Sequence, residues 1–237
     1  MICLSLQKLD YKSLVKAVSK SEMAEIRLDL TELTEVEIGK VFSKERNLIA
    51  TCRLEKLPKE VCIEKLSAAI KGNGPAKKSK VTKYLDIEYD APQDYREAMV
   101  TLARENGFKI IHSYHNFSNT DPFERLLEIT GKCFEYGADI VKIATTAIIT
   151  EEGVRTLRLY RHFEKSRLLA FSMGDAGKFT RLLSLNIGAP FTFAAPKEEL
   201  ATAPGQPLEV EAKAAVNPKS YPHKIKFNSL QTSIKAP

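Results

Sequence analysis

The chain has no apolar run long enough to cross a membrane. Hydrophobic residues make up 43% of its 237 residues, but no stretch approaches the roughly 18 consecutive apolar residues of a membrane span. Residues 1–6 also lack the basic segment that precedes the apolar core of a signal peptide. We therefore expect a cytoplasmic protein that does not associate with a membrane.

Cysteine is scarce, and its spacing excludes two further classes of protein. Cys3, Cys52, Cys62 and Cys133 form no CxxC pair and have no histidine cluster nearby. Small disulfide-stapled domains and structural zinc sites both need closer spacing. The pattern instead indicates free thiols in a reducing compartment.

Positive charge is in excess, but no nucleic-acid motif accompanies it. The net charge is +6, and residues 207–237 contribute five lysines against two glutamates. A second basic cluster surrounds a Gly-Asn-Gly-Pro loop and comprises Lys71, Lys77, Lys78, Lys80 and Lys83. Neither region has the interleaved aromatic residues of a nucleic-acid-binding surface. We expect solvated surfaces and no nucleic-acid partner.

Strand-like and helix-like segments alternate along the first 206 residues. The predicted strands span 2–6, 24–30, 47–53, 84–89, 109–113, 139–144, 167–172 and 191–194. The predicted helices span 11–19, 35–42, 58–70, 93–105, 122–136, 151–165 and 178–184, with Asp121 as the expected N-cap of the fifth. Eight regular units predict a single (β/α)8 TIM-type barrel over residues 1–206, with a doubly wound sheet as the alternative. Residues 207–237 are expected to form a short helix over 208–216 and a basic, partly disordered tail, because prolines interrupt the later part.

Lys142 is the residue least expected at its position. It lies within the apolar segment 138–144, which has the composition of a strand buried on both faces. An unpaired ammonium is costly to bury, so the side chain either reaches water at the strand end or faces a polar cavity. In a cavity, an amine without its proton can attack a ketone or aldehyde and form a Schiff base.

The alternation of side chains along the predicted strands favours the cavity. Successive residues of a strand point to opposite faces, and in 24–30 the charged residues share one face and the apolar residues the other. The inward-facing set predicted in this way is Glu25, Arg27, Asp29, Thr51, Arg53, Asp86, Glu88 and Lys142. His112 has the opposite parity and is expected to face the helices. So many ionisable groups directed inward predict a polar site, which in such a barrel lies at the C-terminal ends of the strands.

Three loops at these strand ends add polar groups. His115 follows the fifth predicted strand, and a histidine can move the protons that Schiff-base chemistry requires. Beyond the seventh, Gly174 and Gly177 indicate a tight turn ahead of Arg181, which could bind a carboxylate. The loop 201–206 is small and polar, which suits a lid; an ordinary connection is the alternative.

Together these motifs resemble the type I 3-dehydroquinate dehydratase family. The matching motifs, in the family's order, are Glu25-x-Arg27-x-Asp29, Arg53, Asp86-Ile87-Glu88, Ser113-x-His115-Asn116-Phe117, Val141-Lys142-Ile143-Ala144, Ser172-Met173-Gly174 with Arg181, and Ala203-Pro204-Gly205-Gln206. Any one of them alone is weak, but the set is specific and covers residues 1–206.

The resemblance implies an activity and a role for each residue. It implies dehydration of 3-dehydroquinate to 3-dehydroshikimate, by syn elimination through a Schiff base on Lys142, in the shikimate pathway to chorismate and the aromatic amino acids. His115 would move the protons and Glu88 would orient it. The implied substrate-binding residues are Glu25, Arg27, Arg53, Arg181, Thr202 and Gln206. Because the iminium is the electron sink, neither a metal ion nor an organic cofactor is implied, and the expected assembly is a homodimer.

The chain departs from the family's pattern in two places near the site. Thr202 stands where the family usually has serine in the lid, and the glycines often found after Arg53 are missing. Two other readings remain open: an aldolase-type Schiff-base barrel with a phosphate site at the Gly174–Gly177 turn, and a non-enzymatic barrel that acts through its basic tail.

Overall fold

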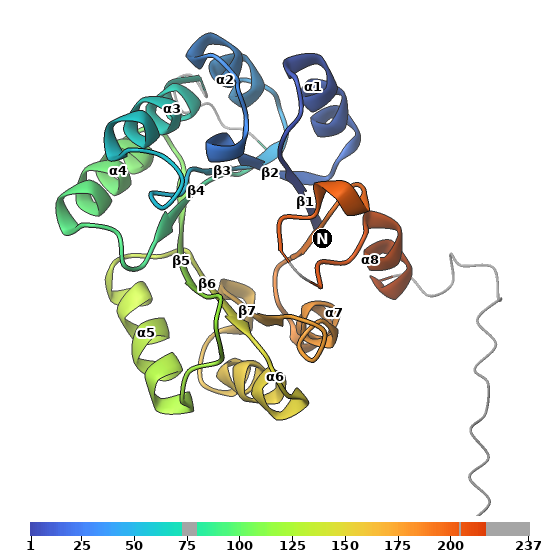
Figure 1. The fold of residues 1–237 in the computed structure, drawn as a ribbon. Helices are drawn as coiled ribbons and strands as arrows, with labels where there is room; N and C mark the ends of the chain where they lie inside the picture. Colours follow the sequence, from blue (N-terminus) through green and yellow to red (C-terminus); the bar gives the residue numbers. More distant parts are fainter. Residues whose placement is uncertain (73–79, 204, 217–237) are drawn as a thin grey trace, which may run out of the picture.

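Eight parallel strands form a nearly closed barrel in the computed structural model, which describes residues 1–72, 80–203 and 205–216. The strands are β1 (Ile2–Leu6), β2 (Met23–Arg27), β3 (Asn47–Thr51), β4 (Lys83–Glu88), β5 (Lys109–Asn116), β6 (Ile140–Thr146), β7 (Leu168–Met173) and β8 (Thr192–Ala194). Their order in the sheet is β7-β6-β5-β4-β3-β2-β1-β8. Figure 1 looks along the barrel and shows the helices outside the ring of strands. The predicted (β/α)8 architecture is confirmed.

The barrel closes between β7 and β8 through side chains. In the described part of the chain these two strands are the ends of the hydrogen-bonded sheet. The rings of Phe171 on β7 and Phe193 on β8 lie 6.3 Å apart, centroid to centroid. Aromatic packing therefore bridges the seam that backbone hydrogen bonds leave open.

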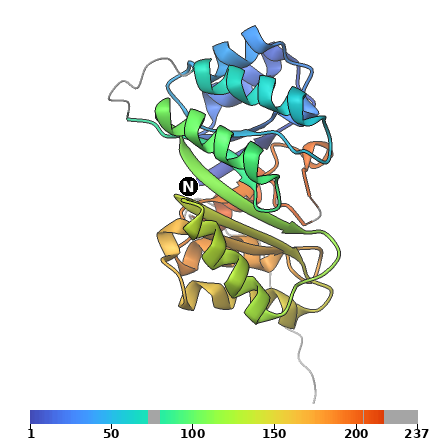
Figure 2. The same cartoon turned by 90° about the vertical axis from the view of Figure 1, so that its left-hand side faces the viewer.

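Helices connect the strands and cover the outside of the barrel (Figure 1, Figure 2). They are α1 (Tyr11–Lys20), α2 (Glu35–Phe42), α3 (Lys59–Gly72), α4 (Gln93–Glu105), α5 (Phe123–Glu135), α6 (Thr150–Leu157), α7 (Phe179–Ile187) and α8 (Glu209–Val216). Short 3-10 turns are η1 (Leu28–Leu30), η2 (Arg158–Arg161), η3 (Lys165–Arg167) and η4 (Glu198–Leu200). The helix predicted over 151–165 ends at Leu157 and continues as the 3-10 turn η2, because its hydrogen bonds tighten there.

The predicted N-cap of α5 was wrong. Pro122 occupies the cap position and no side chain caps the helix. The carboxylate of Asp121 instead accepts hydrogen bonds from the Tyr114 hydroxyl and the Asn116 amide, each at 2.9 Å. It therefore fixes the end of β5, close to His115, and does not serve the helix.

Helix α8 packs on the barrel. Ala195 pairs with Leu208 in a short parallel bridge just before it, and Ala212 is fully buried where α8 contacts β1 and α7. The short helix predicted after residue 206 is thus present. The tail predicted beyond it falls on residues 217–237, outside the described residues, so the end of the barrel domain along the chain stays a prediction.

One lysine of the expected basic surface is buried. Lys83 is only 4% exposed, and its ammonium donates to the carbonyl oxygens of Lys44 and Arg46. Burial lowers its pKa to about 8. Lys83 thus ties the start of β4 to the loop after α2, and the prediction that it belongs to a solvated cluster was wrong.

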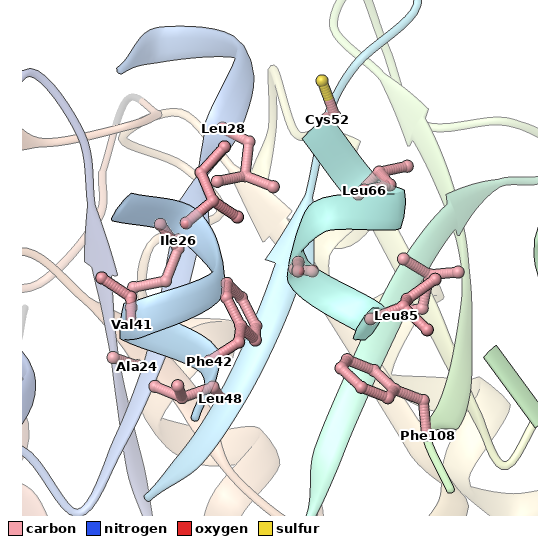
Figure 3. Packing of buried hydrophobic residues seen from close by; sticks show 14 of the residues in the cluster. Ala24, Ile26, Leu28, Val41, Phe42, Leu48, Cys52, Leu66, Leu85 and Phe108 are labelled. Atoms are coloured by element: carbon pink, nitrogen blue, oxygen red, sulfur yellow. The ribbon is translucent and has the colours of Figure 1, made fainter. Parts of the chain in front are cut away.

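The core lies in the shell between strands and helices. Figure 3 shows one part of it, where Ile26 and Leu48 meet Val41 and Phe42 of α2, and Leu66 of α3 faces Leu85. Ile26 and Leu85 are outward-facing apolar residues of β2 and β4, strands that carry charged residues on the other face. Burying an apolar side chain contributes about 1.5–3 kcal/mol, so this shell holds the barrel together while its interior keeps polar groups.

Candidate active site

A cavity of about 180 Å³ opens at the C-terminal ends of the strands. All nine residues predicted for the site line it: Glu25, Arg27, Arg53, Glu88, His115, Lys142, Arg181, Thr202 and Gln206. The lining also includes Ser5, Glu55, Asp90, Phe117, Ala144, Phe171, Met173, Phe193 and Ala203. Charged groups from several strands therefore meet in one place, as the alternation of side chains predicted.

Lys142 projects inward from the middle of β6 and is held between two carboxylates. Its Nζ lies 3.3 Å from Oδ2 of Asp86 and 3.6 Å from Oε1 of Glu25. The ring of Phe193 lies below it, with the centroid 4.3 Å from Nζ. Lys142 is only 6% exposed, so its side chain does not extend to water.

Asp86 is the hub of the polar network. It accepts hydrogen bonds from the Ser113 hydroxyl at 2.5 Å and from Nη2 of Arg53 at 3.1 Å, in addition to its contact with Lys142. Burial alone would raise the pKa of Asp86, but the charges of Arg53 and Lys142 hold it well below its ordinary value. The carboxylate is therefore ionised and fixes two cations of the site.

Glu25 is fixed in a similar way on the other side of Lys142. It accepts hydrogen bonds from the hydroxyls of Ser5 at 2.8 Å and Thr51 at 3.1 Å. Burial would raise the pKa of Glu25, but Lys142 and then Arg27 lower it. Each of its oxygens thus accepts one hydrogen bond from the wall of the cavity, and Oε1 also faces the Lys142 ammonium.

Arg27 is oriented by Asp29 from outside the strand. The two side chains form a bidentate pair, with Nε–Oδ1 at 3.0 Å and Nη2–Oδ2 at 2.6 Å. Asp29 was predicted to face inward from the same strand as Arg27. That prediction was wrong, because β2 ends at Arg27 and Asp29 lies in η1. The pair keeps the planar guanidinium rigid at the cavity wall.

Glu88 and His115 both line the cavity, but they are not joined as expected. The Glu88 carboxylate accepts the backbone N–H of Leu54 at 3.2 Å, and its other oxygen lies 3.9 Å from Nη1 of Arg53. Among the described residues no hydrogen bond connects it to His115, whose ring stacks on Phe117 with centroids 5.8 Å apart. Burial, followed by the charges of Arg53 and Lys142, lowers the pKa of His115 well below its ordinary value, so the imidazole is neutral.

Arg181 is the one cation of the cavity without a carboxylate partner in the described part of the chain. It is 2% exposed, and its Nε has no hydrogen-bond partner there. The guanidinium carbon lies 4.4 Å above the Phe171 ring. Burial lowers the pKa of Arg181 to about 10. The guanidinium of Arg181 thus has no charge partner of opposite sign among the described residues.

The loop predicted as a lid lines this end of the cavity with Thr202, Ala203 and Gln206. Oε1 of Gln206 accepts the backbone N–H of Thr202 at 2.7 Å and its hydroxyl at 2.9 Å, while Gln7 donates to the carbonyls of Leu200 and Ala201. Gly205 has φ +71, and a Cβ there would approach the carbonyl of Gly174 to 3.1 Å. The glycine therefore lets the loop lie directly on the turn after β7.

Sequence reasoning missed several residues of the site. It placed Asp86 inward but gave it no role, and it did not consider Ser5, Glu55 or Asp90. Asp86 could have been found, because it shares a face with Glu88, which lies level with Ser113 and Lys142 across the strands. Glu55 and Asp90 stand at the exposed mouth on loops, where strand periodicity gives no signal.

Comparisons with known proteins agree with this geometry. The sequence model of the type I 3-dehydroquinase family matches residues 2–218. A 3-dehydroquinate dehydratase of Thermococcus gammatolerans is 35% identical over 191 residues, which cover 78% of this chain and 82% of that protein. A 3-dehydroquinate dehydratase of Methanococcus maripaludis is 33% identical over 197 residues, which cover 81% and 85%.

Solved structures give the same answer for the fold. The 3-dehydroquinate dehydratase of Aquifex aeolicus superposes with a TM-score of 0.71 at 26% identity, covering 90% of this chain and 97% of that one. A type I enzyme of Clostridium difficile, solved with covalently modified comenic acid, gives a TM-score of 0.77 at 20% identity and covers 92% and 91%. Fold, family match and relatives agree, and the chain belongs to the type I 3-dehydroquinase family.

Proposed function

We propose that the protein is a 3-dehydroquinate dehydratase that converts 3-dehydroquinate to 3-dehydroshikimate through a Schiff base, as a step of the shikimate pathway. The observation that carries the proposal is that Lys142, His115 and Arg181 line one cavity, and that Arg181 has no carboxylate partner among the described residues. A nucleophile, a neutral base and an anion site are the groups that a carboxylated ketone requires for imine-assisted elimination.

Lys142 acts as the nucleophile. Its amine adds to the substrate ketone, and loss of water from the carbinolamine leaves an iminium ion. Asp86 and Glu25, each within 4 Å of Nζ, provide negative charge that stabilises this cation. The iminium withdraws electrons from the adjacent carbon and makes its proton removable by a weak base.

His115 moves the protons. Its pKa is well below the ordinary value because of burial and the nearby positive charges, so the ring is an acceptor at neutral pH. It removes the proton next to the iminium carbon and returns a proton to the departing hydroxyl on the same face, which gives a syn elimination. Glu88 orients His115 only if substrate displaces the carboxylate from its contact with the Leu54 N–H.

Arg181 binds the substrate carboxylate, while Arg27, Arg53 and Glu25 contact ring hydroxyls and Thr202 and Gln206 close the lid. Supporting this division, Arg27 and Arg53 are already paired with Asp29 and Asp86. Their remaining donors suit neutral hydroxyls, whereas Arg181 has its full charge available for an anion.

Borohydride reduction in the presence of 3-dehydroquinate tests the proposal. Trypsin releases residues 133–142 from the unmodified chain, but a reduced adduct on Lys142 blocks cleavage there and yields 133–155 carrying the substrate mass. Lys142→Ala should abolish the adduct, and Lys83→Met, which removes another buried lysine, should retain it. A stable adduct at any other lysine, or none in active enzyme, would refute the mechanism.

His115→Ala separates imine formation from elimination. We expect slow turnover with the imine still trapped by borohydride. Wild-type turnover in this variant would contradict the acid–base assignment. The aldolase alternative is tested with sugar phosphates: cleavage of a carbon–carbon bond would favour it.

We also propose a cytoplasmic homodimer without nucleic-acid contacts. All four cysteines are free thiols, which suits a reducing compartment. Exposed apolar side chains gather around α6 and α7, namely Ile148, Ile149, Val154, Phe179 and Leu183, and support a self-association surface. Sedimentation of the wild type and of Val154→Glu tests it: a wild-type monomer would refute the dimer.

In residues 1–72, 80–203 and 205–216, no helix is long and apolar enough to span a membrane.

A further inference from the structure

Two of the four cysteines, Cys52 and Cys62, are in contact beside the active site, although nothing in the sequence indicated a pair. Cys52 follows β3 and Cys62 lies in the first turns of α3, and their sulfurs are 3.2 Å apart. Both residues are buried, at 3% and 0% exposure. Figure 3 shows Cys52 at the end of β3. Cys3 and Cys133 have no comparable sulfur contact among the described residues.

The pair is connected directly to Arg53. Cys52 precedes this arginine in the chain, and the thiol of Cys62 donates to the Arg53 carbonyl oxygen at 3.7 Å. The same carbonyl accepts the backbone N–H groups of Lys56 and Leu57. It is therefore the centre of the turn that carries Arg53 toward Asp86 and Ser113.

The two thiols are not equivalent. The Cys52 thiol donates a hydrogen bond to the sulfur of Cys62. This hydrogen bond lowers the pKa of Cys62. The same hydrogen bond, together with burial, raises the pKa of Cys52. Because the thiolate is the nucleophilic form, Cys62 is the sulfur that reacts first with an oxidant. Cys52 then lies in contact and can resolve the product.

We propose that Cys52 and Cys62 are a modification site: hydrogen peroxide converts them to a reversible disulfide that displaces Arg53 and weakens substrate binding. The Cys62 thiolate attacks the peroxide oxygen, the O–O bond breaks, and sulfenic acid and water form after protonation. The Cys52 sulfur then displaces hydroxide from the sulfenic acid, which leaves as water with the Cys52 proton. Two thiols are oxidised and one peroxide is reduced to two waters.

The displacement of Arg53 follows from the distances. A disulfide requires sulfurs about 2.0 Å apart, so the pair must close by roughly 1.2 Å from its 3.2 Å separation. Oxidation also removes the proton that Cys62 donates to the Arg53 carbonyl. Since misplacing a site by about 1 Å can cost up to 100-fold, we expect the KM for 3-dehydroquinate to rise roughly ten-fold, with a smaller change in kcat.

The covalent step can be tested without any activity. The folded protein is treated with hydrogen peroxide, free thiols are alkylated, and the non-reduced tryptic digest is analysed by mass spectrometry. We expect peptides 47–53 and 60–65 to be joined and to separate after dithiothreitol. Cys133→Ala, which removes a buried cysteine of α5, should still give the joined pair. Failure to join them, or pairing through Cys3 or Cys133, overturns the proposal whether or not the protein is a dehydratase.

The kinetic step rests on the proposed function and has its own outcome. Oxidised wild type and Cys133→Ala should show the raised KM, and reduction should restore the original value. Cys52→Ala and Cys62→Ala should show no such reversible rise, because neither can form the disulfide. Two variants are used so that the test does not depend on the folding of a single substituted β3–α3 turn. A joined pair with an unchanged KM overturns the coupling to Arg53. An equal peroxide effect in all four proteins assigns the damage to another residue and likewise overturns it.

Discussion

Replacing Arg181 by methionine should stabilise the empty protein while it destroys substrate binding. Burial lowers the pKa of Arg181 from the ordinary value of an arginine to about 10. That difference corresponds to about 3 kcal/mol by which the fold disfavours the guanidinium charge. Against this stands the contact with the Phe171 ring at 4.4 Å, which is worth about 0.5–2 kcal/mol. Methionine fills a similar length without charge, so the net gain is about 1–3 kcal/mol.

Thermal unfolding without substrate measures this gain. For a chain of this size about 1 kcal/mol moves the midpoint by 2–4 °C, so Arg181→Met should melt roughly 2–12 °C higher. The same variant should raise KM by at least about 30-fold, because a buried charge pair contributes about 2–5 kcal/mol to binding. The higher melting temperature and the weaker substrate binding would then have the same cause, which is the removal of the buried charge of Arg181.

The control is another arginine over an aromatic ring. Arg158 is exposed and lies 4.0 Å from the Phe123 ring centroid, so Arg158→Met loses a similar ring contact without relieving any burial. It should leave the melting temperature unchanged or slightly lower. If Arg181→Met melts lower than wild type, or keeps its affinity for 3-dehydroquinate, the account of Arg181 as an unpaired anion site is incorrect.

Further predictions concern the other charged groups of the site. Asp86→Asn should lower the free energy of unfolding by about 3 kcal/mol at pH 7, because Lys142 and Arg53 both lose the Asp86 carboxylate. The folded-state pKa of Asp86 lies below its unfolded value, so urea titrations should show this difference shrinking as the pH falls below about 4. The profile of kcat/KM should stay level to below pH 6.5, since His115 accepts a proton only at a lowered pKa. In Arg53→Gln the acidic limb should move to higher pH, and an unmoved limb would exclude Arg53 as its cause. Thr202→Ser should raise kcat if lid motion limits turnover, and viscosity dependence of kcat measures that. Dialysis against a chelator should leave activity unchanged; loss would indicate a metal.

Strand periodicity predicted the inward-facing residues well, because the alternation of faces is a property of the backbone itself. It identified Lys142 as an inward-facing residue from its neighbours alone, and the structure confirms this placement. The same rule failed for Asp29, where it was applied beyond the end of β2. Once the chain turns into η1, alternation no longer holds, and Asp29 instead orients Arg27.

The partners within the site could not be predicted in the same way. Which carboxylate meets which cation depends on rotamers and on loops that approach from elsewhere in the chain. Glu88 illustrates this, because the N–H of Leu54 occupies the oxygen expected to face His115. The contact between Cys52 and Cys62 has the same origin, since a strand end and a helix meet only after the β3–α3 turn has formed.

The pattern of pairing also indicates how the substrate lies in the cavity. Arg27, Arg53 and Lys142 each have a carboxylate within 4 Å, so their charge is largely balanced before substrate arrives. Arg181, on α7 beyond the seventh strand, is not balanced by any described carboxylate. If Arg181 binds the substrate carboxylate, as proposed above, we expect the carboxylate to lie on the β7 side of the cavity and the ketone to face Lys142 on β6. A site with two unpaired arginines would bind the carboxylate in more than one orientation, and only one of these presents the ketone to the amine.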